Sequence, residues 1–237
     1  VKPTFDFLNP VLIILFVGFV HASGWRKVIQ YLSIYAIFYM LIMSPWWVHQ
    51  YQKYGMFVRL NLGDGVVLYS GNNPLNKTGG GVGRISGDSD MNLEQFSYIK
   101  DPIERNNAMK DAAVGYIVKN PYRFIELAGM KFMRFWRLWP HTEYYQQWYV
   151  IAASLLSYGV ILCLSIGFMF RQTRENFRRL TPVFALFVYL TLVHMITIGS
   201  IRYRFPLEPF LIIFASYFLV DILKNKTWFI QFQNKLI

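Results

Sequence analysis

The stretch WYVIAASLLSYGVILCLSIGFMF at positions 148–170 decides the fold class, because it contains no charged residue. About 20 apolar residues in a helix cross the roughly 30 Å hydrocarbon core of a bilayer. The next stretch, RQTRENFRR at 171–179, holds four arginines and one glutamate. The positive-inside bias places such a basic cluster in the cytoplasm. The two stretches together predict a transmembrane helix that is followed by a cytoplasmic loop.

Four further apolar segments flank this helix. They lie at 8–21, 28–47, 181–200 and 205–223. The first is short for a span, and its length also suits a re-entrant or tilted segment. We therefore expect an all-α polytopic membrane protein with about five transmembrane segments and a large, mixed, partly helical extracytoplasmic loop.

The composition agrees with a membrane protein. Apolar residues make up 54% of the chain and charged residues only 16%, whereas a soluble domain carries about 25% charged residues. The net charge of +11 comes mainly from basic residues between and beside the apolar segments. That placement favours orientation in a membrane and contact with anionic lipid over binding of nucleic acid. The single cysteine, Cys163, excludes an intrachain disulfide, and its apolar surroundings disfavour a catalytic thiolate.

The basic clusters predict the domain organisation. Arg26 and Lys27, and the lysines after the last segment, fall on the same side as 171–179 if the segments alternate. The expected units are two membrane segments in 1–47, an extracytoplasmic loop domain with an interfacial helix in 48–147, three transmembrane helices in 148–223 and a cytoplasmic tail in 224–237.

The expected loop domain has two halves. The part at 49–90 is rich in glycine and asparagine, which predicts turns, short strands at most and little helix. Asp101-Pro102 is a good helix start, and that helix should end near Asn120. A second helix is expected at 121–139. It gathers Arg123, Lys131, Arg134 and Arg137 on about a third of its circumference, with aromatic residues on much of the rest, as in a helix that lies in the membrane interface.

Three other patterns have an ordinary explanation that outweighs a functional one. GGGVG at 79–83 lacks the strand and helix of a phosphate-binding loop, so a flexible loop is the better interpretation. Asp64, Asp88 and Asp90 form no complete set of metal ligands, which favours solvated turn residues; no cofactor and no metal site are expected. His194 lies within a span, where a neutral histidine bonded to a neighbouring helix is favoured over a proton relay.

The most informative short segment is RYRFPLEP at 202–209. Arg202 and Arg204 stand at the outer end of a span beside a proline-stiffened turn. Guanidinium groups bind phosphate in a bidentate manner, and a low-dielectric surrounding strengthens the contact. Contact with lipid headgroups, or pairing of one arginine with Glu208, explains the same charges equally well.

Several stretches together resemble bacterial GT-C glycosyltransferases, relatives of the protein O-mannosyltransferases and of the lipid A aminoarabinose transferase. They occur in order between about 44 and 223. The stretches are SPWWVHQY at 44–51, GMFV at 55–58, YSGNNP at 69–74, AMK at 108–110, YIVKNP at 116–121, KFMRFW at 131–136 and RYRFPLEP at 202–209. His49 departs from this pattern, because relatives more often carry arginine there.

The resemblance implies an integral protein of the bacterial cytoplasmic (inner) membrane. It would transfer a sugar from a polyprenyl-phosphate donor to a lipid, glycan or protein acceptor at the extracytoplasmic face. The catalytic base is expected upstream of Val1, so no catalytic residue is assigned here. The expected substrate-binding residues are Arg202, Tyr203, Arg204, Asn72, Asn73, His49, Lys131 and Arg134.

Each group of these residues has an expected role. Arg202 and Arg204 would stabilise the leaving phosphate, the asparagines would hydrogen-bond sugar or phosphate, and Lys131 and Arg134 would attract the anionic lipid. A transporter or flippase for a lipid-linked sugar, or a non-catalytic scaffold subunit, remains the alternative.

Overall fold

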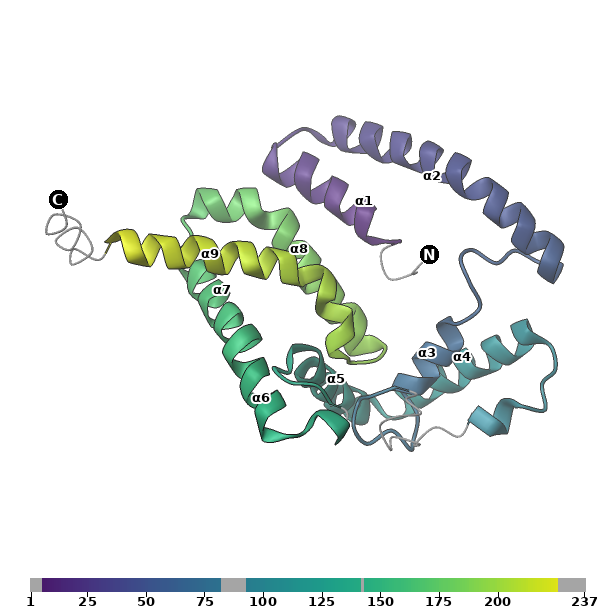
Figure 1. The fold of residues 1–237 in the computed structure, drawn as a ribbon. Coiled ribbons are helices and arrows are strands. Elements are labelled where there is room, and N and C mark those ends of the chain that lie inside the picture. The colour runs from purple at the N-terminus through teal and green to yellow at the C-terminus, as the bar shows by residue number, and fades with distance from the viewer. Residues whose placement is uncertain (1–5, 82–92, 142, 226–237) are drawn as a thin grey trace, which may run out of the picture.

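The protein is described by a computed structural model that covers residues 6–81, 93–141 and 143–225, and all regular structure in these ranges is helical (Figure 1). One group of helices is apolar. It comprises α1 Leu8–Ile13, the π-helical η2 Ile14–Val20, α2 Trp25–Tyr54, α6 Trp148–Ser154, the π-helical η5 Leu155–Gly159, α7 Val160–Phe170, α8 Arg174–Ile196 and α9 Glu208–Asn225.

The remaining helices connect the apolar ones. They are α3 Asp64–Gly71, the 3-10 turn η3 Leu93–Phe96, α4 Pro102–Lys119, α5 Pro121–Trp136, the 3-10 turn η4 Glu143–Tyr145 and the 3-10 segment η6 Ile201–Leu207. We call α3, η3, α4 and α5 the loop unit.

Within the described ranges, four helical stretches are long and apolar enough to cross a membrane. They are Trp25–Tyr54, Trp148–Phe170, Glu175–Ile196 and Ile201–Lys224. The segment expected at 8–21 is a shorter apolar helix, Leu8–Val20, which packs against α2 and α8. Where about five transmembrane segments were expected, the described part of the chain thus has four helices that could cross a membrane, which indicates a helical membrane protein.

The spanning helix α2 is longer than predicted. The apolar pattern predicts an end near Trp47, but α2 continues through Pro45 to Tyr54. Gly55 then ends it with φ of +69°, a left-handed conformation that glycine adopts at little cost. The indole groups of Trp46 and Trp47 donate hydrogen bonds to the carbonyls of Leu60 and Arg59, which fold the following chain back along the helix.

The loop unit corrects the prediction of turns and short strands at 49–90. Among the described residues this part contains no strand, and it forms α3 instead. Helix α3 packs with η3 and α4 through Tyr69, Phe96, Met109 and Ala113, which are all buried. The start of α4 is confirmed, because the carboxylate of Asp101 accepts hydrogen bonds from the two amides at 103 and 104.

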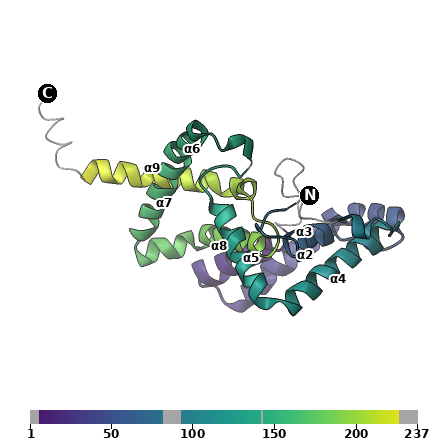
Figure 2. The ribbon, with the colours of Figure 1, turned by 90° about the horizontal axis from the view of Figure 1, so that it is seen from below.

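Helix α5 places its two faces in an unexpected way. Leu127, Lys131 and Phe135 are buried, whereas Tyr122 is 88% exposed and Ile125 is also exposed. Figure 2 shows α4 and α5 meeting at a sharp corner. The side of α5 that faces the protein therefore carries Lys131 between the apolar Leu127 and Phe135, and other apolar residues of the helix face outward, as they do in a helix that contacts lipid.

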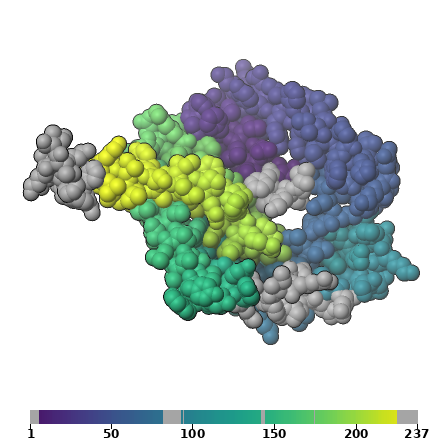
Figure 3. Space-filling view, viewed as in Figure 1, coloured from purple at the N-terminus to yellow at the C-terminus, as the bar shows by residue number. Residues whose placement is uncertain are grey.

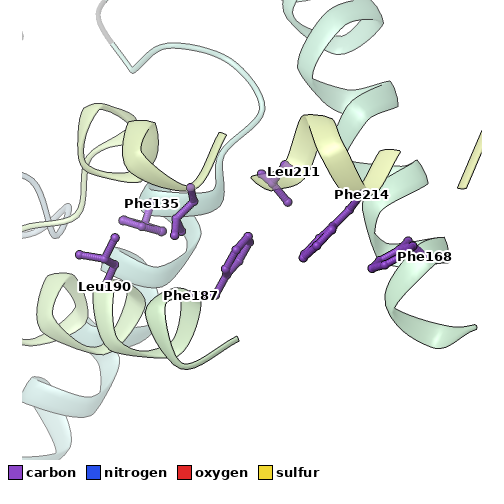
Figure 4. Close-up of a cluster of buried hydrophobic side chains, with 7 residues drawn as sticks. Phe135, Phe168, Phe187, Leu190, Leu211 and Phe214 are labelled. Carbon is purple, nitrogen blue, oxygen red and sulfur yellow. The ribbon is translucent and has the colours of Figure 1, made fainter. Parts of the chain in front are cut away.

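The main core joins α5 to three membrane helices (Figure 4). Its buried residues are Phe135, Phe168, Phe187, Leu190, Leu207, Leu211 and Phe214. The rings of Phe168 and Phe214 stack with centroids 4.6 Å apart. This core holds α5 against α8 and so fixes the loop unit relative to the spans.

Gly65 tests the packing of α3 on α4. A methyl group added at Gly65 would lie 2.0 Å from the carbonyl oxygen of Asn106, whereas one added at Gly115 of α4 meets nothing within 4 Å. We expect Gly65→Ala to lower the resistance of the loop unit to trypsin in detergent, because backbone atoms must move. Gly115→Ala is the matched control and should be neutral or stabilising, since alanine favours helix by about 1 kcal/mol. Equal resistance of both variants would contradict this packing.

Candidate functional site

A hollow lies where the loop unit meets α8, and we call it the junction cavity. Figure 3 shows the surface hollowed between the chain leading from α2 to α3 and the region of η6. Its volume is about 460 Å³, a size typical of ligand pockets, which often lie at such interfaces. The lining residues are Phe7, Asn61, Gly63, Asp64, Val67, Leu68, Lys110, Tyr189, Val193, His194, Thr197, Ile198 and Tyr203.

Asp64 and Lys110 form the charged end of the junction cavity. The Asp64 carboxylate accepts hydrogen bonds from the Asn106 amide at 2.7 Å and from the Lys110 ammonium at 3.1 Å. Burial by itself raises the pKa of Asp64, but these two hydrogen bonds outweigh it and lower the pKa, so the carboxylate is ionised at neutral pH. The side chains of Lys110 and Asp64 are 51% and 53% exposed, which leaves both open to a ligand.

Aromatic rings form the opposite wall of the cavity. The His194 ring stacks on Tyr203 with centroids 4.3 Å apart and an interplanar angle of 6°. On its other side His194 stacks on Phe135 at 5.6 Å. The three stacked rings come from α5, α8 and η6 and hold these elements in contact. The predicted hydrogen bond of His194 to a neighbouring helix stays a prediction.

Lys131 holds the end of α8 that forms this wall. Its side chain is 0% exposed, and its ammonium donates to the Asn72 side-chain oxygen at 2.8 Å and to the Ile196 carbonyl at 3.2 Å. Ile196 is the last residue of α8. The last carbonyls of a helix lack partners within the helix and carry partial negative charge, so a lysine is favourable there.

Close backbone contacts surround the same point. A methyl group added at Gly71 would lie 1.7 Å from the Thr197 carbonyl oxygen, and one added at Gly199 would lie 2.5 Å from that of Lys131. The Gly199 amide also donates to the Gly79 carbonyl at 3.2 Å. The chain after α3, helix α5 and the end of α8 therefore meet here without space for larger residues.

The asparagines predicted to bind sugar are internal. Asn72 and Asn73 are buried. The Asn72 amide donates to the carbonyls of Leu68 and Ile196, and the Asn73 oxygen accepts from the amides at 75 and 76. Their hydrogen-bonding groups are used within the protein, and their contact with substrate stays a prediction. The lipid contact of Lys131, whose side chain is buried, also stays a prediction.

Arg204 points toward α5 and does not line the junction cavity. It is buried, and its guanidinium donates to the carbonyls of Arg137 and Phe135 at the end of α5. It also pairs with Glu208 at 3.5 Å and lies 3.6 Å from the centre of the Tyr158 ring. Of the two explanations for this charge, the pairing with Glu208 is the one present.

The other predicted residues are dispersed. Arg202 and His49 are exposed on η6 and α2 respectively, and Arg134 is half-buried with its Nε donating to the Gly199 carbonyl at 3.4 Å. Tyr203 is the one predicted substrate-binding residue among those that line the junction cavity. The predicted set thus does not form a single site.

Asp64 and Lys110 were not selected from the sequence as substrate-binding residues. Asp64 entered only a weak metal hypothesis with Asp88 and Asp90, which lie outside the described residues. Within the described ranges, no group of three histidine, cysteine or acidic side chains is placed to hold a metal. The spacing of Asp64 and Lys110, 46 positions apart, gives no local signal; only the pairing of α3 with α4 brings them together.

No protein-family model matches the chain, and comparisons with curated proteins and with solved structures found no match. The resemblance to GT-C glycosyltransferases therefore depends on the short motifs alone.

The buried Lys131 predicts a pH-dependent stability. Burial lowers its pKa from 10.5 to about 7. Between these two values the unfolded chain binds more protons than the folded one, so stability rises with pH across the window and the contribution is constant below it. The melting temperature of the purified protein should thus rise from pH 7 to pH 9 more steeply than that of Lys131→Met, in which the other titrating groups are unchanged. Parallel curves would contradict the assignment.

The position of Arg204 predicts a structural defect. Arg204→Ala leaves the carbonyls of Phe135 and Arg137 without this donor, and each unsatisfied buried group costs about 1–3 kcal/mol. We expect a melting temperature lowered by several degrees and less protein in the membrane. Arg202→Ala, on the exposed side of η6, is the control and should behave as the unchanged protein. A stable Arg204→Ala protein would show that these contacts contribute little.

Proposed function

We propose that this chain forms part of a membrane glycosyltransferase. The enzyme would transfer a sugar from a polyprenyl-phosphate donor to a lipid, glycan or protein acceptor at the extracytoplasmic face of the bacterial inner membrane. The motifs that resemble GT-C enzymes suggest the reaction. The junction cavity carries the proposal, because it joins an apolar lining to a charged end where the spans meet the loop unit.

The lining suits an amphipathic ligand. Val67, Leu68, Val193 and Ile198 supply apolar surface, as an isoprenoid chain requires. Asp64 supplies an ionised carboxylate that accepts hydrogen bonds from sugar hydroxyls, and charged acceptors make the stronger hydrogen bonds. Lys110 beside it supplies a cation for a phosphate. We assign the sugar-bearing end of the donor to this charged end of the cavity.

The helix arrangement is compatible with the proposed orientation. The α1–α2 and α7–α8 connections lie toward the upper left of Figure 1, and the loop unit lies toward the lower right. The basic residues Arg26, Lys27 and Arg178 belong to the first of these ends. The positive-inside bias makes that end cytoplasmic, so the junction cavity would open at the outer face.

A transfer assay tests the proposal. Membranes that contain the full-length protein are supplied with radiolabelled undecaprenyl-phosphate-linked hexose, pentose and aminosugar in turn, and label transferred to an acceptor is measured. Donor-dependent transfer supports an enzyme. Movement of label across the membrane without transfer indicates a transporter, and neither activity indicates a scaffold subunit; both results contradict the proposal.

Asp64→Asn provides the residue-level prediction. The amide keeps the shape of the side chain but loses its charge, and a hydrogen bond to a charged group contributes about 1.5–3 kcal/mol. We expect transfer to fall about tenfold or more. Asp111→Asn makes the same chemical change on the next residue after Lys110, at an exposed position of α4, and should leave transfer unchanged. An equal effect of both substitutions would remove Asp64 from the site.

A further inference from the structure

A second hollow lies among the membrane helices, at the end of the molecule away from the loop unit. It measures about 310 Å³, and we call it the membrane groove. The residues that line it are Leu12, Ile13, Phe16, Val17, Tyr31 and Pro182. They come from α1, η2, α2 and α8, which lie together in the upper part of Figure 1. With one phenol as its only polar side chain, this groove has the chemistry of a binding site for a hydrocarbon chain.

Two irregular helical elements border the membrane groove. η2 is π-helical from Ile14 to Val20, a wide and uncommon helix form that occurs often at functional sites. Pro182 lies inside α8, where it removes one backbone hydrogen bond and places its ring on the helix surface. Both irregular elements contribute residues to the groove.

Basic residues stand one helical turn from the groove. Arg178 precedes Pro182 by four residues on α8, and Lys27 precedes Tyr31 by four on α2, so each lies on the same helix face as a lining residue. Arg178 is fixed in place, because its Nε donates to the Phe19 carbonyl at 2.9 Å. Arg26 and Lys27 are exposed at the start of α2.

These three cations lack an acidic partner in the described part of the chain. The nearby Glu175 pairs with Arg179 at 2.6 Å, and Asp221 pairs with Arg171 at 2.8 Å. No ion pair in the described ranges involves Arg26, Lys27 or Arg178. An uncompensated positive charge beside an apolar groove is complementary to a ligand with an anionic head and an apolar tail.

We propose that the membrane groove binds an anionic phospholipid, with one acyl chain against Phe16 and Pro182 and the phosphate against Lys27 and Arg178. Guanidinium and ammonium groups form charge-assisted hydrogen bonds with phosphate. Basic residues near a membrane surface attract anionic lipid, and such residues lie at this end of the spans. A zwitterionic lipid fills the same groove but leaves the cations less well compensated. This site is independent of the proposed sugar transfer.

The test compares two lipids with identical acyl chains. The purified full-length protein in detergent is titrated with phosphatidylglycerol or phosphatidylcholine, and the bound lipids are counted by native mass spectrometry. We expect a saturable site that prefers phosphatidylglycerol. Lys27→Gln and Arg178→Gln should each reduce that preference about fivefold. Arg171→Gln removes a basic residue just after α7 that already pairs with Asp221, and it should leave the preference unchanged.

A variant that fills the membrane groove distinguishes the contribution of the acyl chain to binding from that of the phosphate. Val17→Phe adds volume inside the membrane groove without changing any charge, and it should weaken binding of both lipids. Trypsin resistance equal to that of the unchanged protein shows that each variant is folded. Equal binding of the two lipids, an effect of Arg171→Gln as large as that of Lys27→Gln, or full binding by Val17→Phe would overturn the proposal.

Discussion

The arrangement of the loop unit depends on one buried ammonium group. Lys131 binds the side chain of Asn72 and the last carbonyl of α8, partners that are 59 and 65 positions away in sequence. A charge removed from water is costly unless polar groups replace the solvent. The lowered pKa of Lys131 reduces that cost, since the neutral amine donates the same hydrogen bonds. The junction cavity lies beside this contact, so its wall at Thr197 and Ile198 is positioned by Lys131.

The same contact explains why basic side chains of α5 face the protein. In water a basic face would be outside, but beside a membrane the polar groups find partners in the protein while the apolar groups find lipid. Lys131, Arg134 and Arg204 all bind backbone carbonyls around α5 or the chain after α8. Exposed apolar residues such as Ile125 and Met133 remain on the other side. The helix is thus joined to the spans by polar contacts as well as by the packing of Phe135, and its other apolar residues face outward.

The parts of the fold that could be predicted are those that depend on residues close together in the sequence. A charge-free segment of sufficient length predicts the span at 148–170, and the Asp101 cap predicts the start of α4. Helix α3 was missed, because its eight residues include two glycines and its stability comes from packing on α4. The hydrogen bonds that Asn72 and Lys131 make within the protein were not foreseen for a related reason. The groups that bind phosphate or sugar also bind carbonyls, and the distant partner that decides between them has no local sequence signal.

The charges used within the structure restrict where a phosphate can bind. The guanidinium of Arg204 is occupied by carbonyls and Glu208, and the ammonium of Lys131 is enclosed. Lys110 is the half-exposed cation that lines the junction cavity, but it already pairs with Asp64. A phosphate at Lys110 therefore competes with this carboxylate, and a carboxylate released from Lys110 has a higher pKa and is a stronger base. Under the proposed function, a donor phosphate at Lys110 would in this way make Asp64 a better hydrogen-bond acceptor for a sugar hydroxyl.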